Sequence, residues 1–284
     1  MIRIVTDSTG YLPPEFIKKY DISVVPLKVQ FGHETYDEIT GISNRDFYQR
    51  LTTTYDFPTT SQPSAGEFKD VYQKILSQDP NAEILVLTIS SKLSGSYNSA
   101  TTAAEQLSEA RITVFDSLSA AMGLGLMVMA GVKMAANGQD MSEIMARLEQ
   151  MRRETVIVLV VDTLEYLKRG GRIGAAAAFL GTLLNTKPIL TVVEGEIRPL
   201  DRVRTKKKAI DRLFIELKRQ LPRPDQAIQA GVMHVIAEAE AERLAGMIQE
   251  HFNVTYCLIS ELGPVVGAHV GPGAVGVGFC PEPE

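Results

Sequence analysis

Short apolar runs alternate with helical patterns along the first 160 residues, and this alternation constrains the fold more than any other feature. Residues 2–5 and residues 83–89 are two such runs, rich in Ile, Val and Leu. Runs of this kind are typical of strands buried on both faces of a parallel sheet. A loop and a helical pattern follow each run, which is the order of elements in a doubly wound α/β domain. A β-branched run at residues 155–161 ends the series, and we predict that it belongs to the same parallel sheet.

The pattern of elements changes after residue 160. Two strand patterns within residues 188–200 flank a Glu-Gly-Glu turn, a spacing typical of a hairpin, and residues 227–259 supply one more β-α-β unit. A glycine-dense tail then ends in a strand. Since 284 residues also suggest about two domains, we predict an N-terminal parallel α/β domain over residues 1–160 and a C-terminal mixed α/β domain over residues 161–284.

Composition restricts the class of protein. The formal charge of −5 argues against sequence-independent nucleic-acid binding, which needs a basic face. Cys257 and Cys280 have neither metal-ligand spacing nor the pattern of a disulfide framework, so we expect a reduced, cytoplasmic compartment. The chain begins directly with a strand pattern, which predicts that no signal peptide is present.

Residues 118–136 form the most membrane-like segment of the chain. Lys133 and several glycines interrupt it, and its apolar core is short for a bilayer span. We therefore predict a buried helix here, capped by Asp116 and Ser117, and no integral membrane segment. Methionines cluster on this helix and are interpreted either as plain core or as the lining of a lipid tunnel.

A serine-rich loop, Ser90 to Ala100, joins the strand at residues 83–89 to the helix that follows. Ligands of open α/β sheets bind at such carboxyl ends of strands. Gly95 allows close approach of the backbone, and Ser94 offers a hydroxyl beside a helix N-terminus that favours an anion. The competing interpretation is that Ser94 only caps the helix.

A second cluster of hydroxyl groups lies between Pro58 and Pro63, which hold the segment extended. It is either a ligand-binding segment or a Ser/Thr-rich linker. The basic residues also allow both a binding and a purely structural interpretation. Arg169 and Arg172 flank two glycines and either clamp an anion or end a helix, and the run Arg202–Lys208 is either a solvated helix face or a docking site for an acidic partner.

Catalytic constellations are weak in this sequence. Ser94 with His269 as its base is one candidate, but the glycine that a nucleophile elbow needs two residues before the serine is missing, and nothing marks a third member. The histidines show no metal-ligand spacing, so we expect no metal. No Gly-x-x-x-x-Gly-Lys-Ser/Thr motif is present, so the sequence has no obvious nucleotide site of its own.

Six dispersed motifs together resemble the DegV family, in the family's order and at family-like spacing over essentially the whole chain. They are Ile-Val-Thr-Asp-Ser-Thr at 4–9, Pro-Thr-Thr-Ser-Gln-Pro at 58–63, Leu-Ser-Gly-Ser-Tyr at 93–97, Arg-Gly-Gly-Arg-Ile at 169–173, Val-Arg-Thr-Lys at 203–206 and Ala-His-Val-Gly at 268–271.

The resemblance implies a two-domain α/β protein that binds a long-chain fatty acid, such as palmitate, between its domains. It further implies that the protein is the fatty-acid-binding subunit of a fatty acid kinase and presents the carboxylate to a separate kinase subunit. By position, the resemblance assigns fatty-acid contacts to Thr60, Ser61, Ser94, Gly95 and His269. It assigns phosphate or kinase contacts to Arg172 and Arg204.

The residues themselves favour this assignment. Two hydroxyls and a helix-terminal N–H group supply the converging donors that a carboxylate needs, without a buried cation. Our main hypothesis is therefore a cytoplasmic fatty-acid-binding protein with no cofactor and no catalytic residues of its own. The alternatives are a serine-dependent acyl- or phosphoryl-transfer enzyme and a regulatory module that binds another small anion through Arg169, Arg172 and the run Arg202–Lys208.

Overall fold

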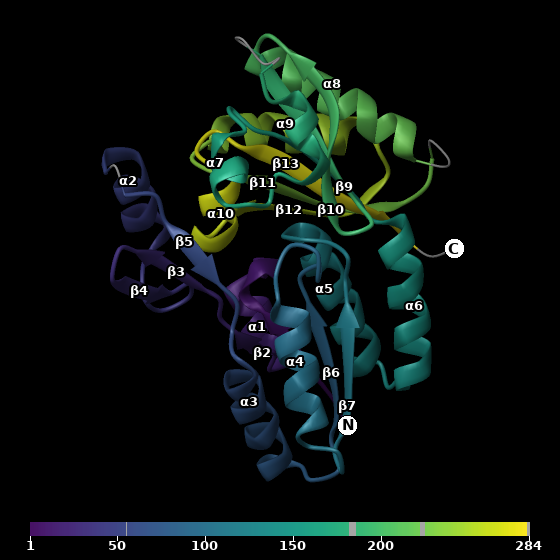
Figure 1. Ribbon diagram of the computed structural model, residues 1–284. Helices are drawn as coiled ribbons and strands as arrows, with labels where there is room; N and C mark the ends of the chain where they lie inside the picture. The colour runs from purple at the N-terminus through teal and green to yellow at the C-terminus, as the bar shows by residue number, and fades with distance from the viewer. Residues whose placement is uncertain (55, 182–185, 222–224, 283–284) are drawn as a thin grey trace.

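Two β-sheets lie on either side of one buried helix, α5 (Met122–Ala136), as Figure 1 shows. The structure is a computed structural model that describes residues 1–54, 56–181, 186–221 and 225–282. Helix α5 contacts strands of both sheets, and one hydrophobic core extends through it from the first sheet to the second. The α/β architecture predicted from the sequence is confirmed.

The first sheet is parallel throughout, with strand order β2 (Ser23–Val25), β1 (Ile2–Asp7), β6 (Glu83–Thr88) and β7 (Arg111–Asp116). Helices α3 (Ala65–Gln78) and α4 (Ser96–Glu105) cover its outer face around Phe68 and Tyr72, which are fully buried. Ser64 and Glu67 form a capping box at the start of α3. This half of the chain is the predicted parallel α/β layer.

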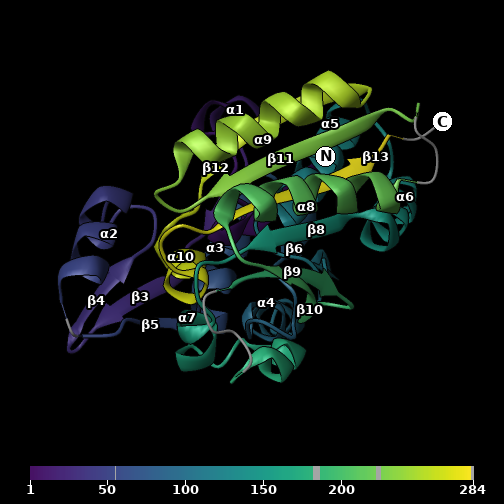
Figure 2. The same ribbon diagram turned by 90° about the horizontal axis from the view of Figure 1, so that it is seen from above.

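The second sheet is mixed, and Figure 2 shows helices α8 (Lys206–Gln220) and α9 (Glu238–His251) across its outer face. Most neighbouring strands of this sheet are antiparallel, and β11 and β12 are parallel. Its strand order is β10 (Glu196–Val203), β9 (Lys187–Val193), β8 (Val156–Val160), β13 (Val275–Pro281), β11 (Ile228–His234) and β12 (Val254–Glu261).

Strand β8 corrects one sequence prediction. We expected residues 155–161 in the parallel sheet, but β8 pairs antiparallel with β9 and β13 of the mixed sheet. Helix α6 (Met141–Glu154) precedes β8, so the chain passes to the second sheet before residue 160. An apolar run shows that a strand is buried, whereas its backbone partners decide which sheet it joins. The division into domains at residue 160 remains a prediction.

A small third sheet projects from the first, with strand order β4 (Glu34–Asp37), β3 (Lys28–Phe31) and β5 (Thr59–Ser61). Helix α2 (Asn44–Thr53) accompanies it. Residues 59–61, left open as a ligand segment or a linker, are thus a strand. Helix α10 (Pro264–Val270) lies against this sheet and against α7 (Glu165–Arg169). The sequence reading missed α10 within the glycine-dense tail.

The remaining elements are short. They are the 3₁₀ turns η1 (Ser8–Gly10) and η2 (Gly174–Phe179) and helix α1 (Pro14–Tyr20). The helix expected at residues 175–184 is the turn η2 as far as Phe179, and residues 182–184 lie outside the described part of the chain. The predicted cap of α5 is wrong: α5 begins at Met122, and the Asp116 carboxylate accepts the N–H groups of Ser91 and Leu118 instead.

Glycines allow α5 to lie directly on the second sheet. A Cβ atom at Gly231 of β11 would stand 2.6 Å from the Met122 side chain, and one at Gly278 of β13 would stand 3.0 Å from the Gly123 nitrogen. Any side chain at these two positions would push the helix away. No helix within the described ranges is long and apolar enough to cross a membrane, and α5 is buried in the protein as predicted.

Candidate functional site

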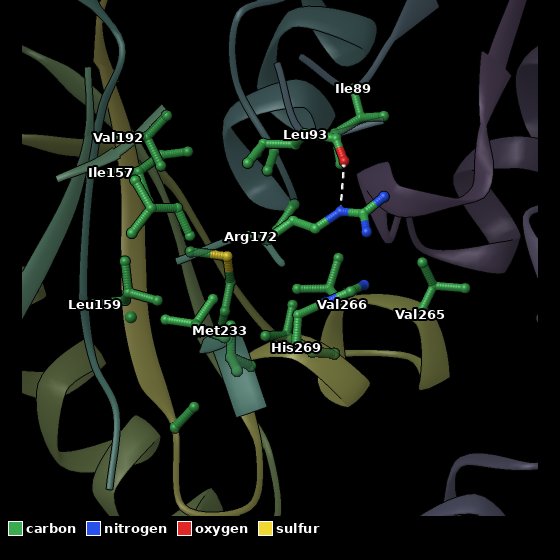
Figure 3. A pocket seen from close by; sticks show the side chains of 18 of the residues that line it. Ile89, Leu93, Ile157, Leu159, Arg172, Val192, Met233, Val265, Val266 and His269 are labelled. Carbon is green, nitrogen blue, oxygen red and sulfur yellow. Dashed lines mark hydrogen bonds between the residues drawn. The ribbon is translucent and has the colours of Figure 1, made fainter. Parts of the chain in front are cut away.

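An apolar pocket lies between the two sheets, bounded by α10, β8, β9 and the loop after β6. Most of its lining is aliphatic, and Figure 3 shows several of these side chains turned toward one space. Among the lining side chains, five are polar: Thr60, Gln62, Ser94, Arg172 and His269. Four of them are residues that the sequence had singled out. The arrangement is that of a pocket for an apolar molecule with one polar end.

A hydrogen bond between Thr60 and His269 marks this polar end. Thr60 Oγ1 on β5 lies 2.8 Å from His269 Nε2 on α10, although 209 residues separate them. Packing of α10 against β3 and β5 brings the two side chains together. Two sequence motifs that lie far apart in the chain therefore form one site.

His269 is held in a neutral state. Its pKa is lowered to about 4, first because burial disfavours the imidazolium and second because the cationic Arg172 is near. The Nδ1 atom is buried and has no hydrogen-bond partner among the described residues. Gly170 leaves room for the ring, since a Cβ atom there would stand 2.1 Å from Nδ1. Of the two ring nitrogens of His269, Nε2 thus makes the hydrogen bond, and its partner is Thr60.

Ser94 both lines the pocket and supports the start of α4. Its Oγ lies 2.9 Å from the Ser96 hydroxyl and accepts the Ser96 N–H at 3.3 Å. The two interpretations of Ser94 as a cap and as a pocket residue are therefore compatible. Gly95, the N-cap residue of α4 and a predicted contact, is not itself among the lining residues; it lies against Gln62, since a Cβ atom at Gly95 would stand 2.6 Å from Gln62 Nε2. The sequence reading missed Gln62.

Arg172 stands beside the same polar end, between Leu93 and His269 in Figure 3. Its Nε donates to the Leu93 carbonyl at 3.0 Å, and its Nη1 donates to the Gly170 carbonyl at 2.8 Å. The side chain is half-buried. A fixed, half-buried guanidinium therefore belongs to the pocket lining, in addition to the hydroxyl groups from which we expected an anion site without a buried cation.

Two other predicted contacts lie elsewhere. Ser61 is half-buried, pairs with Lys28 across β3 and β5, and is not among the lining residues. Arg204 is exposed just before α8 and is likewise outside the lining. Most of the clustered methionines are core residues of α5, whereas Met233 of β11 faces the pocket.

The serine-nucleophile alternative finds little support in this geometry. His269 bonds to Thr60 rather than to Ser94, and no acid among the described residues orients its Nδ1. A nucleophile needs a base within hydrogen-bond reach, and that base needs an orienting partner. Within the described chain, no group of three or more His, Cys, Asp or Glu side chains is placed to hold a metal ion.

Buried carboxylates brace the elements that carry these side chains. Asp7 accepts the N–H of Ile89, at the start of the loop that carries Ser94, at 2.7 Å. Glu38, 7% exposed, accepts a hydrogen bond from the Ser8 hydroxyl, and its Oε1 accepts the Val265 N–H of α10 at 2.9 Å. Burial is the main reason that the pKa of Glu38 is raised to about 7. The Asp-Ser motif at the end of β1 thus connects directly to the Ser94 loop and, through Glu38, to α10.

Comparisons with known proteins agree with this architecture. A family model described as "uncharacterised protein, DegV family" matches residues 1–282. A DegV domain-containing protein of Clostridium perfringens is 37% identical, over 99% of this chain and 99% of that protein.

Solved structures show the same likeness. A DegV family protein of Thermus thermophilus superposes with a TM-score of 0.94 at 36% identity over 99% of each chain. That structure is described as one of fatty acid binding. A stearic acid-binding protein of Eubacterium ventriosum superposes with a TM-score of 0.90 at 28% identity, over 99% of this chain and 98% of that one.

Proposed function

The chain belongs to the DegV family, and from this premise we propose that it binds a long-chain fatty acid, such as palmitate, in the pocket between its sheets. One observation carries the proposal: an otherwise aliphatic pocket has Thr60, Ser94, His269 and Arg172 among its few polar lining groups. The fatty acid binding described for the relatives from Thermus thermophilus and Eubacterium ventriosum supports it.

The Thr60–His269 pair supplies a donor for the carboxylate. When His269 carries its proton on Nε2, that N–H donates to Thr60 Oγ1, and the threonine hydroxyl proton is free to point at the ligand. The Ser94 hydroxyl is a second donor. The remaining N–H groups of Arg172 add a charge-assisted bond, which is the strongest kind available to a carboxylate.

The acyl tail supplies affinity through its apolar surface. Each methylene that leaves water contributes roughly 0.8 kcal/mol, so a chain of about sixteen carbons contributes on the order of 10 kcal/mol before the costs of binding. Away from the polar residues, the pocket lining is aliphatic, so the tail contacts apolar side chains. Head and tail are therefore held by different forces.

We further propose that the protein presents the carboxylate to a separate kinase in the cytoplasm rather than acting as an enzyme by itself. The sequence lacks a phosphate-binding loop of the Gly-x-x-x-x-Gly-Lys type, so the phosphoryl donor would come with the partner. Arg204 is exposed and lies within the basic run Arg202–Lys208, which suits an acidic surface on that partner. Arg172, which lines the pocket, would then contact the acyl phosphate.

Native mass spectrometry tests the binding step. The purified protein should carry the mass of one long-chain acid, and added palmitate should raise the melting temperature of the delipidated protein. The pair of changes Thr60→Val and Ser94→Ala should weaken palmitate binding by about a hundredfold or more, since each hydrogen bond to a charged group contributes about 1.5–3 kcal/mol.

Thr59→Val with Ser91→Ala is the matched control, because Thr59 is exposed and neither residue lines the pocket. Those changes should leave palmitate affinity intact. A delipidated wild-type protein that neither gains mass nor gains stability with palmitate would contradict the proposal.

A further inference from the structure

The acyl pocket shares part of its wall with a second hollow. Ile157 of β8 and Val192 of β9 line the pocket and also line a neighbouring groove. The two residues are adjacent because β8 and β9 pair with Val158 opposite Thr191, and Figure 3 shows their side chains together, away from His269. The adjacent residues Ile157 and Val192 thus lie between the two spaces.

The neighbouring groove is open to water and partly apolar. Its lining includes Leu118, Val156 and Leu200, together with Val193, which is 39% exposed. The Arg153 side chain, which also borders the groove, is 70% exposed. A chain that passed between Ile157 and Val192 would therefore find an apolar floor and room to continue.

Other sides of the pocket are backed by protein instead. Leu159 of β8 is paired with Gly276 of β13, and a Cβ atom at Gly276 would stand 2.9 Å from the Leu159 Cβ, so β13 lies directly beside Leu159. The Sδ atom of Met233 accepts the Met122 N–H of α5 at 3.4 Å. Neither Leu159 nor Met233 lines the neighbouring groove, so shortening these side chains would enlarge the pocket itself, whereas shortening Val192 would open a passage into the groove.

We infer that Ile157 and Val192 form the end wall for the acyl tail and set the longest fatty acid that the pocket accepts. This inference rests on the proposed fatty-acid binding. Of the two residues, Ile157 is 5% exposed and is held from behind, since a Cβ atom at Gly123 of α5 would stand 2.7 Å from its Cδ1. Val192 is half-buried, which makes it the residue to change first.

Affinity measured against chain length gives the test. For saturated acids from twelve to twenty-two carbons, each added methylene should lower Kd about fourfold until the tail reaches the wall, after which Kd should rise. Val192→Ala should move this minimum to a longer acid by about two carbons, and Val192→Leu should move it to a shorter one. The double change Ile157→Ala with Val192→Ala should move it furthest.

Val266→Ala is the matched control, because Val266 is a half-buried lining valine beside His269 at the polar end. It should change all Kd values by a similar factor and leave the minimum where it is. A minimum unchanged in Val192→Ala and Val192→Leu, with palmitate still bound, overturns the end wall alone. Wild-type protein that binds none of these acids overturns the proposed function as well.

Discussion

The two ends of the pocket are built in different ways. At the polar end, side chains come from β5, the loop before α4, the turn after α7, and α10, which are short elements or loops far apart in the chain. At the apolar end, β8, β9, β11 and β13 present aliphatic side chains from one continuous sheet. One end depends on hydrogen bonds between separate segments, the other on packing within a sheet.

Because the two ends are built differently, substitutions at each end should have different effects on binding. Hydrogen-bond geometry fails when one partner moves by about an ångström, whereas an aliphatic wall tolerates changes that conserve volume. Changes at the polar end should therefore alter affinity for every fatty acid alike. Changes at the apolar end should alter which acid is preferred.

Glu38→Gln tests the brace beneath α10. The pKa of Glu38 is raised from 4.5 to about 7, so the protonated carboxyl stabilises the fold. That contribution is complete below pH 4.5 and is lost as pH rises through 7, which amounts to about 3 kcal/mol at most. Urea unfolding should show wild-type stability falling by this order relative to Glu38→Gln between pH 5 and pH 8.

Glu34→Gln is the control for this measurement, because Glu34 is only four residues before Glu38 in the chain but pairs with Arg50 at the surface. It should leave the pH slope of wild type unchanged between pH 5 and pH 8. His269 titrates in all three proteins, so the comparison cancels its contribution. Equal slopes in wild type and Glu38→Gln would mean that the carboxyl is already charged at pH 5.

Gly170→Ala tests the space behind His269. Gly170 has an ordinary φ of −73°, so the added methyl group acts only by its contact with the imidazole. The ring should shift away from Thr60, with a loss of about 1–3 kcal/mol in the free energy of unfolding and a weaker affinity for palmitate. Urea unfolding and displacement of a fluorescent fatty acid measure the two effects.

The neighbouring change Gly171→Ala separates strain from contact. Gly171 has φ of +69°, and nothing lies within 4 Å of an added Cβ atom. It should lower stability by about 1 kcal/mol through backbone strain and leave palmitate affinity unchanged. If both alanine variants bind palmitate as wild type does, the position of His269 does not govern the polar end.

Arg172→Ala against Arg204→Ala tests the smallest of these effects. Arg172 is a fixed, half-buried lining residue, and Arg204 is exposed outside the pocket. Arg172→Ala should weaken palmitate binding about tenfold, as expected for one lost charge-assisted contact, and Arg204→Ala should leave it within twofold. Fluorescent displacement at constant salt measures both. Unchanged affinity in both variants would support our first expectation, in which the anion site uses no cation.

Local patterns in the sequence predicted most elements but not all of their neighbours. The strands of the parallel sheet and the capping box of α3 follow from periodicity and capping chemistry, which act over a few residues. Strand β8 was placed in the wrong sheet because an apolar run does not encode its partners. Helix α10 was missed because two of its residues, Pro264 and Gly267, are poor helix formers in a tail full of glycine.

The site was predictable to a similar extent. The hydroxyl clusters and His269 carried a chemical signal, and the family resemblance joined them. Gln62 and Met233 gave none, since a surface amide and a strand methionine are ordinary until the fold turns them toward one space. The part played by Arg172 depended on two backbone carbonyls, Leu93 and Gly170, which no sequence motif displays.

Helix α5 comes from the first half of the chain, yet it supplies apolar side chains to the inner faces of both sheets. Without α5, the inner face of each sheet would lack part of its hydrophobic core. A gene divided at codon 160 would encode two fragments. The first would expose one side of α5 to water, and the second would expose the inner face of β11 and β13. The protein should accordingly melt in a single cooperative step. The two fragments should fold only when they are produced together.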